Sequence, residues 1–371
     1  MRDHRTAKPS LWTAAILTGL LLAACGSSSG SSSSSTNAAD TTTASASASA
    51  NASASATSAA ALPATSGAPA AAAVAPAASA GGVTLRIGDQ AGTGAETLLE
   101  ASGLISKLPF KVTWSDFTSG PPMLQALAAG DLDIGGVGDA PPVFAAAGHA
   151  NLAIVGALAT GANNAAVVVP ANSPIHSISQ LKGKKIAVAQ GSSADYHLLT
   201  VLEKAGLTPK DVTLDYLQPA DGLAALQSGD VDAWDIWSPF IEEATIRDGD
   251  RILVNGSGYG SPYSYEVASK TALASPKLVA AIGDYLKLLN RAHVWANTHP
   301  DAWGAVWAKA TGLTPAIMDR AAADDKLTPA PVTGTIVSAE QGLVDAFFKA
   351  GLIPRSYDFS PYASSAFAND L

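Results

Sequence analysis

The stretch Met123-Leu-Gln-Ala-Leu-Ala-Ala-Gly-Asp-Leu-Asp-Ile134 decides the fold, because the chain repeats it closely as Gly222-Leu-Ala-Ala-Leu-Gln-Ser-Gly-Asp-Val-Asp-Ala233. Each copy predicts a short helix, a Gly-Asp turn and a strand. The similarity extends upstream, where residues 85–90 correspond to residues 185–190 and a further helix follows each segment. A duplication of this size predicts two similar α/β lobes with a ligand cleft between them.

The N-terminal segment has the pattern of an export signal. Basic residues precede an apolar run over 11–24, and the run ends in Leu22-Ala-Ala-Cys25. This ending resembles the lipobox of bacterial lipoproteins, which implies that residues 1–24 are a signal peptide and that Cys25 is lipidated after cleavage. More than one acyl chain gives durable membrane attachment. We therefore expect a protein anchored by lipid to the extracytoplasmic face of the cell membrane.

Residues 25–82 form a predicted tether between this anchor and a folded body. After Cys25 the tract consists almost entirely of Ser, Ala, Thr, Gly and Pro. Such a composition buries too little apolar surface to offset its chain entropy, so we predict disorder. A glycosylated stalk remains an alternative for this Ser- and Thr-rich tract.

The composition of the chain limits the classes of function. The formal net charge is −9 and the chain has no run of Lys or Arg, so we do not expect nucleic-acid binding. Cys25 is the only cysteine, which excludes an intramolecular disulfide and a cysteine-based metal site. The histidines show no ligand spacing, so we predict no metal and no cofactor. We expect a monomer.

The remaining chain, 83–371, is long enough for two domains. Short β-branched strands alternate with helical patterns, which predicts a mainly parallel sheet in each lobe. The region 275–349 is predicted to be nearly all helical. Two Gly-, Ser- and Asn-rich segments suit hinge crossings between the lobes. We predict that 83–162 together with 259–371 forms lobe 1 and that 163–258 forms lobe 2.

Small, donor-rich residues follow the predicted strands. They occur at 90–94, 118–121, 138–139, 190–193, 218–220 and 237–239. In open α/β sheets, ligands bind beyond the carboxyl ends of the strands, and the N–H groups that open a helix favour an anion. N-capping alone could explain any single loop. The whole set of loops around one cleft instead favours binding of a small anion.

Five segments resemble the aliphatic sulfonate-binding proteins of ABC importers, which belong to a taurine, nitrate and sulfonate type. The segments are Phe117-Thr-Ser-Gly-Pro-Pro-Met-Leu-Gln-Ala-Leu127, Gly138-Asp-Ala-Pro-Pro-Val-Phe144, Lys182-Gly-Lys-Lys-Ile-Ala-Val188, Gln190-Gly-Ser-Ser-Ala194 and Asp232-Ala-Trp-Asp-Ile-Trp-Ser-Pro239. The resemblance implies a type II periplasmic-binding-protein fold that captures a sulfonate between its lobes. The ligand then passes to a membrane permease that works with a separate ATPase. A thiamine-type pyrimidine or nitrate is the alternative ligand.

The candidate site residues lie in these loops and on the strand that returns to lobe 1. Ser119, Gly120, Ser192 and Ser193 are predicted to surround the anionic head of the ligand, and Gln90 adds an amide. Trp237 is predicted to pack against the organic tail, and Tyr265 to reach the cleft. Asp139 is predicted to orient the facing loop or to meet a ligand amine.

Two acidic residues depart from the family pattern. Asp89 and Asp195 stand where many relatives have an aromatic residue and a histidine. If both carboxylates face the ligand, a zwitterionic amino-sulfonate such as taurine is favoured over an alkanesulfonate. If both point to solvent, the preference does not change. We expect Asp89 to point to solvent and leave Asp195 open.

An enzymatic function is not expected. The sequence lacks the Gly-x-Ser-x-Gly, His-Glu-x-x-His and phosphate-loop motifs. Ser193, Asp195 and His197 would share one helical turn, where they cannot form a relay of nucleophile, base and orienting acid.

Overall fold

The computed structural model describes residues 82–90, 94–161, 163–324 and 326–368. All of them fall within one compact unit, Ala72–Leu371. The predicted signal peptide, Cys25 and the predicted tether up to residue 81 lie outside the described residues.

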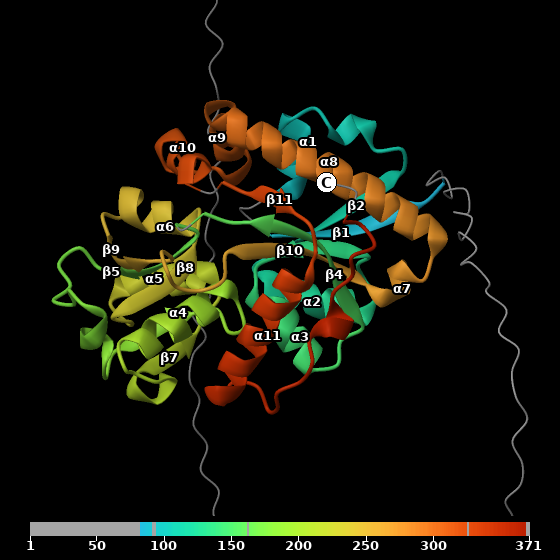
Figure 1. Ribbon diagram of the computed structural model, residues 1–371. Coiled ribbons are helices and arrows are strands. Elements are labelled where there is room, and N and C mark those ends of the chain that lie inside the picture. Colours follow the sequence, from blue (N-terminus) through green and yellow to red (C-terminus); the bar gives the residue numbers. More distant parts are fainter. Residues whose placement is uncertain (1–81, 91–93, 162, 325, 369–371) are drawn as a thin grey trace, which may run out of the picture. The chain divides into compact units, whose positions relative to one another are not determined.

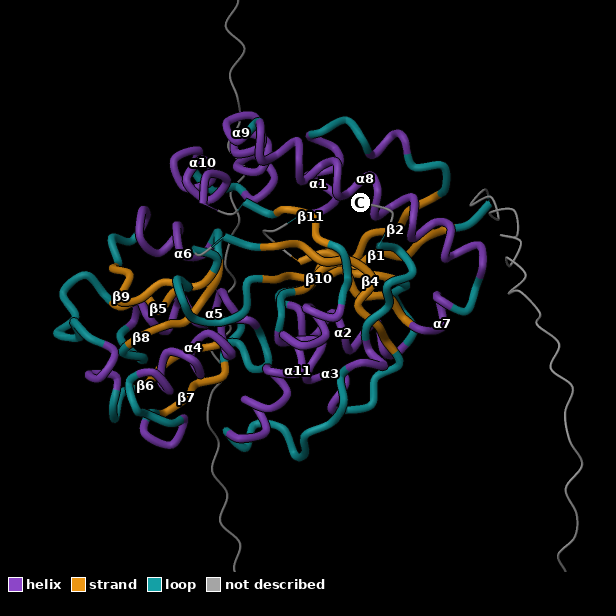
Figure 2. Tube along the Cα trace, in the orientation of Figure 1, coloured by secondary structure: helices purple, strands orange, loops and turns teal. Residues whose placement is uncertain are grey.

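The strands of the described residues form two separate sheets (Figure 2). The first sheet has the order β11-β4-β10-β3-β1-β2. Its strands are β1 Thr84–Gln90, β2 Lys111–Phe117, β3 Ile134–Val137, β4 Leu152–Ala159, β10 Tyr263–Ser269 and β11 Thr328–Ala330. The second sheet has the order β7-β6-β8-β5-β9. Its strands are β5 Ala165–Val169, β6 Lys185–Val188, β7 Thr213–Tyr216, β8 Ala233–Trp237 and β9 Arg251–Asn255.

The helices lie on both faces of these sheets (Figure 1). They are α1 Ala95–Ala101, α2 Gly120–Ala129, α3 Ala140–Ala147, α4 Ser193–Lys204, α5 Pro219–Ser228, α6 Phe240–Glu242, α7 Lys270–Leu273, α8 Pro276–Thr298, α9 Pro300–Thr311, α10 Pro315–Asp324 and α11 Gly334–Lys349. The expected helical C-terminal third is interrupted by β11, a three-residue edge strand with a proline at its centre.

The chain crosses between the sheets twice, once after β4 and once after β9. This arrangement confirms the predicted fold of two α/β lobes joined by two crossings. The prediction of mainly parallel sheets is wrong, because only two of the five strand pairings in the first sheet and two of the four in the second are parallel. Strands β2-β1-β3 and β7-β6-β8 pair in parallel, but β5 and β10 pair antiparallel with both of their neighbours. Each of these two strands follows a crossing, so it enters its new sheet from the opposite end.

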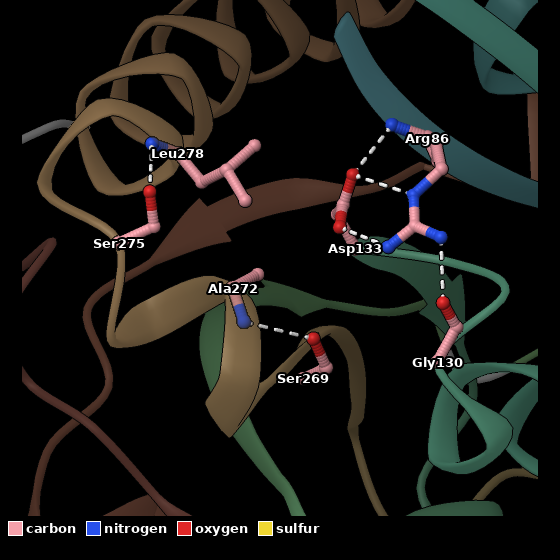
Figure 3. Close-up of polar contacts among 7 residues, drawn as sticks. All are labelled: Arg86, Gly130, Asp133, Ser269, Ala272, Ser275 and Leu278. Atoms are coloured by element: carbon pink, nitrogen blue, oxygen red, sulfur yellow. Dashed lines mark hydrogen bonds and ion pairs between the residues drawn. The ribbon is translucent and has the colours of Figure 1, made fainter. Parts of the chain in front are cut away.

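The repeated Gly-Asp turn has the same function in both lobes. Gly130 and Gly229 end their helices with positive φ angles of 88° and 77°, a conformation that favours glycine. Three residues later, the Asp133 carboxylate accepts the backbone N–H of Arg86 at 2.9 Å, and Asp232 accepts that of Lys185 at 2.9 Å. Figure 3 shows the first of these sites, where the Arg86 guanidinium also bonds Asp133 and the Gly130 carbonyl.

These bonds correct the register of the upstream similarity by one residue. Lys185 is the counterpart of Arg86 rather than of Leu85, because both residues make the same backbone contact with the repeated aspartate. The aspartate ties each turn to the neighbouring parallel strand, which explains why the repeat conserves Asp between the two copies.

Each sheet separates two apolar clusters. In the second sheet, Ala233 packs on the face covered by α4 and Trp234 on the face covered by α5 and α6. This alternation follows from the two-residue period of a strand. Trp234 is 0% exposed and belongs to the core of this lobe.

Candidate functional site

A cavity of about 150 Å³ lies between the two lobes. Residues of both sheets, of both lobes' helices and of the first crossing line it. Six of the predicted site residues are among them: Gln90, Gly120, Ser192, Ser193, Trp237 and Tyr265.

Helix starts provide the hydrogen-bond donors of the cavity. Helix α2 begins at Gly120, which is followed by two prolines, and α4 begins at Ser193 after the N-cap Ser192. The Ser192 hydroxyl accepts the Asp195 N–H at 3.4 Å. The first N–H groups of a helix have no partner within the helix, so the N–H of Gly120 and those at the start of α4 can donate to a ligand anion, whereas the two prolines after Gly120 have no N–H.

Ser119 and Asp139 lie beside the cavity rather than on its lining. The Ser119 side chain is fully buried and donates to Gln218 Oε1 of the other lobe at 2.8 Å. Asp139 caps α3 by accepting the Ala140 N–H at 2.8 Å. Burial raises the pKa of Asp139 to about 6, and a hydrogen bond from Ser193 opposes this rise. Both residues therefore connect the lobes around the site.

The expectation that Asp89 points to solvent is wrong. Asp89 is 7% exposed, and its carboxylate accepts the N–H groups of Gln90, Ala95 and Glu96 at 2.9–3.1 Å. It thereby caps α1 while its side chain borders the cavity. Burial raises its pKa, and these backbone bonds oppose the rise.

Asp195 also has a local structural role. It is 2% exposed and accepts the Gly191 N–H at 2.8 Å, so it stabilises the turn that carries Ser192. Burial raises its pKa to about 6. Asp195 is not among the residues that line the cavity. Of the two acidic residues, only Asp89 therefore borders the cavity.

Aromatic and apolar side chains form part of the wall. Trp237 lines the cavity, and its ring meets Phe240 edge-on with the centroids 6.1 Å apart. Tyr265 is 1% exposed and stacks on Tyr263 with the centroids 6.4 Å apart. Leu158 extends this surface from β4. The wall can accommodate an apolar ligand segment next to the polar helix starts.

The first crossing also contributes polar groups that the sequence argument missed. Thr160 and Asn164 line the cavity, and the Asn164 amide donates to the Thr160 hydroxyl at 2.9 Å. The Thr160 N–H bonds the Pro262 carbonyl at 2.8 Å, which links the two crossings. The donor-rich composition of this segment was the available signal, but it favoured a hinge equally well.

The lining also contains two titratable residues that were not predicted, Glu266 of β10 and His293 of α8. Burial and the nearby Asp89 raise the pKa of Glu266 to about 8. Burial lowers the pKa of His293 to about 4, so its imidazole is neutral at pH 7. A single charged residue in the strand Tyr263–Ser269 was the sequence signal for the first of them.

A second cavity of about 600 Å³ shares Asp89 and Gln90 with the first. Its lining combines carboxylates with apolar side chains: Glu96, Asp116, Glu243, Phe240, Trp307 and Leu313. Among the described residues that line either cavity, none is Lys or Arg. A bound anion would therefore depend on neutral donors and helix starts.

The described residues contain neither a candidate metal site nor a candidate membrane span. Within these ranges, no three His, Cys, Asp or Glu side chains gather in a way that could hold a metal ion. No helix in the described part of the chain is both long enough and apolar enough to cross a membrane.

The fold and the interlobe cavity define a bilobal α/β solute-binding protein of the type II periplasmic-binding class. Residues 118–302 match the family model described as NMT1/THI5 like. The chain belongs to this family and, within it, to the aliphatic sulfonate-binding proteins, which confirms the resemblance in the sequence.

Three proteins illustrate this membership. A protein of Escherichia coli (strain K12) that is named as an aliphatic sulfonates-binding protein is 35% identical over 74% of this chain and 86% of its own length. The alkanesulfonate-binding protein SsuA from Xanthomonas axonopodis pv. citri, solved bound to MOPS, is 33% identical. It has a TM-score of 0.71 and covers 79% of this chain and 99% of its own. The periplasmic aliphatic sulphonate-binding protein SsuA from Escherichia coli is 32% identical, with a TM-score of 0.67 over 75% and 91% of the two chains.

The same fold also occurs in an enzyme. The desulfurization enzyme DSZB has a TM-score of 0.58 at 18% identity, a likeness that shows the fold alone. The fold by itself therefore does not separate binding from catalysis.

Proposed function

We propose that this protein captures an aliphatic sulfonate or amino-sulfonate outside the cytoplasm and delivers it to the permease of an ABC importer. The observation that carries this proposal is the interlobe cavity, into which α2 and α4 present their first residues, Gly120 and Ser193. These neutral donors suit a sulfonate oxygen, and Trp237 suits the attached carbon chain. The sulfonate ligands named for the relatives support the same ligand class.

The mechanism is lobe closure without chemical change of the ligand. A ligand that contacts both lobes favours the closed state by its difference in affinity for the closed and open states. The Ser119–Gln218 bond links the two lobes, and we expect it to stabilise the closed state. The closed protein then docks on the permease, which works with a separate ATPase.

The surroundings of Ser193 support binding rather than catalysis. Asp195 accepts the Gly191 N–H, and His197 Nδ1 faces Asp235 at 2.8 Å in the core of the second lobe. Ser193, Asp195 and His197 therefore form no relay, and the Ser193 side chain instead bonds the Asp139 carboxylate that caps α3. The protein is therefore proposed to be a non-enzyme without a cofactor.

The proposal includes the predicted organisation of the whole chain. Residues 1–24 are removed as a signal peptide, Cys25 is lipidated, and residues 25–82 tether a monomeric body to the membrane. Lobe 1 comprises 83–162 and 259–371, and lobe 2 comprises 163–258. Mass spectrometry of the mature N-terminal peptide tests the anchor: a diacylated Cys25 supports it, and an unmodified peptide starting elsewhere contradicts it. If Cys25 is not lipidated, Cys25→Ser would also leave membrane association unchanged.

Thermal unfolding with a ligand panel tests the binding function. The panel contains ethanesulfonate, taurine, sulfate, nitrate and an aminopyrimidine, each added to the purified full chain. A ligand at about 100 times its Kd stabilises the folded state by roughly 2.7 kcal/mol, which raises the melting temperature. We expect a shift with at least one sulfonate. A shift with only nitrate or the aminopyrimidine would replace sulfonate by that alternative ligand, and no shift with any member would contradict the proposal.

A further inference from the structure

The proposed binding of the sulfonate by the starts of α2 and α4 does not involve one buried carboxyl that lines the same cavity. Glu266 is 5% exposed, lies on the central strand β10 and lines the same cavity as Ser192 and Ser193. Its Oε2 atom is buried and has no hydrogen-bond partner. A buried oxygen without a hydrogen-bond partner costs free energy. Because this oxygen lies beside a ligand cavity, a donor group of the ligand can satisfy it.

The neighbouring strands are shaped around this carboxyl. Glu266 pairs with Gly136 of β3 on one side and with Gly156 of β4 on the other. A Cβ atom at Gly136 would lie 2.8 Å from Glu266 Oε1, and one at Gly156 would lie 3.2 Å from Glu266 Cβ. A side chain at Gly136 would displace the carboxyl, and one at Gly156 would crowd the Cβ atom of Glu266. The two glycines therefore keep a space in the middle of the sheet for Glu266.

The groups around Glu266 favour a positive charge. Asp89 of β1 borders the same cavity and raises the pKa of Glu266 together with burial. From α8, Tyr285 contributes a buried hydroxyl whose pKa is raised by burial, and His293 contributes an imidazole that is neutral at pH 7. No Lys or Arg is among the described residues that line the cavity, so a cation that pairs with the ionised Glu266 carboxylate has to come with the ligand.

We infer that Glu266 forms a second subsite that binds a protonated amine of the ligand, so that the ligand is an amino-sulfonate. The inference rests on the proposed sulfonate-binding function and narrows its ligand class. The serines of α4 hold the anionic end from one lobe, and Glu266 holds the cationic end from the other. A ligand with two charged ends thus bridges the lobes and favours their closure.

Binding at this subsite has a measurable proton balance. With a pKa of about 8, the empty Glu266 side chain is mostly protonated at pH 7. An ammonium group that donates to Glu266 Oε2 favours the carboxylate, so the carboxyl proton leaves to solvent when the ligand binds. A sulfonate without an amine leaves this proton in place. Proton release therefore distinguishes binding of an amine at Glu266 from a preference for taurine that does not involve this carboxyl.

Isothermal titration calorimetry of the full chain at pH 7 tests the inference. The ligands are taurine, ethanesulfonate and 2-hydroxyethanesulfonate, measured in phosphate and in Tris, neither of which contains a sulfonate. We expect taurine to bind about tenfold or more tightly than either other ligand and to release about one proton, seen as a buffer-dependent enthalpy. Glu266→Gln should remove both the taurine preference and the proton release.

A matched variant controls for loss of a buried carboxyl. Glu242 is 4% exposed, accepts the Ser238 hydroxyl at 2.8 Å and is not among the residues that line the cavity. Glu242→Gln should retain the taurine preference and the proton release. Equal affinities for the three sulfonates, or a preference and proton release that persist in Glu266→Gln, would overturn the inference while leaving sulfonate binding intact. Failure of all three sulfonates to bind would overturn the proposed function together with the inference.

Discussion

The Ser119 hydroxyl donates a 2.8 Å hydrogen bond to Gln218 Oε1, and these two residues lie 99 positions apart in the chain. The same spacing relates Met123 to Gly222 in the internal repeat. Each residue is the N-cap of its helix, Ser119 of α2 and Gln218 of α5. Equivalent positions of the two lobes thus meet across the cleft, and the Thr118 hydroxyl adds a second 2.8 Å bond to the same oxygen.

We predict that Gln218→Ala weakens sulfonate binding by about three- to tenfold. The substitution removes two interlobe hydrogen bonds to the same oxygen. A hydrogen bond contributes a net value of about 0.5–1.5 kcal/mol. The bond from Thr118 is exposed to solvent, so we expect the pair together to contribute little more than one such bond. Calorimetric titration measures the effect. Gln227→Ala is the matched control, because Gln227 lies on the same helix but bonds Asp250 within lobe 2. Identical affinities of the two variants would remove Gln218 from the closing mechanism.

Trp237→Ala should weaken binding by at least several-fold without unfolding the protein. The ring lines the cavity, so its loss removes apolar contact with the ligand tail. Titration calorimetry and circular dichroism test affinity and folding separately. Trp295→Ala serves as the control, because Trp295 of α8 stacks on His299, the residue that follows this helix, and is not among the cavity residues. Unchanged affinity in Trp237→Ala would place the tail elsewhere.

The two repeated aspartates should differ in their effect on stability. The side chain of Asp133 is 3% exposed in its ion pair with Arg86, whereas that of Asp232 is 39% exposed in its pair with Lys184. We expect Asp133→Ala to lower the free energy of unfolding by about 3 kcal/mol, because it leaves buried donors unpaired. Asp232→Ala should cost about 1 kcal/mol. Urea denaturation of both variants, followed by tryptophan fluorescence, compares them, and a reversed order would contradict the argument from burial.

The buried His197–Asp235 pair predicts a pH-dependent contribution to stability. Burial acts to lower the pKa of His197, but the Asp235 carboxylate holds it above its ordinary value. Burial raises the pKa of Asp235, and the bond to His197 opposes that rise. A raised folded-state histidine pKa gives stability that is present below the unfolded value, near 6.5, and is lost as the pH rises through the folded value.

Asp235→Asn should therefore destabilise the protein more at pH 6 than at pH 9. The loss at pH 6 is expected to be about 3 kcal/mol, because the charged imidazole remains buried without its partner. Urea denaturation at the two pH values measures it. Asp215→Asn is the control, since Asp215 forms a partly exposed pair with Lys185 and should show little pH dependence over this range. An equal loss for Asp235→Asn at pH 6 and pH 9 would refute the proposed ionisation of His197.

Local patterns explain why much of the fold could be predicted. The period of apolar residues distinguishes helices from strands, and the repeated turn fixes helix ends through glycines such as Gly130. The loops that end the strands could be assigned to a cleft because parallel strands of one sheet share a carboxyl edge. These rules require only neighbouring residues, so six of the eight candidate ligand residues could be placed on the cavity lining from the sequence.

The tertiary structure alone decided which polar side chains are available to a ligand. Asp89 and Asp195 are bonded to backbone N–H groups of nearby turns, whereas Glu266 keeps an unpartnered oxygen at the cavity. The sequence around each of these carboxylates does not show which of them keeps an unpartnered oxygen. The difference arises from packing between distant segments, because Gly136 and Gly156 flank Glu266 only once β3, β10 and β4 lie side by side. The sequence by itself thus determined the two lobes and the position of the cleft, and the assembled sheet decided which charge faces the ligand.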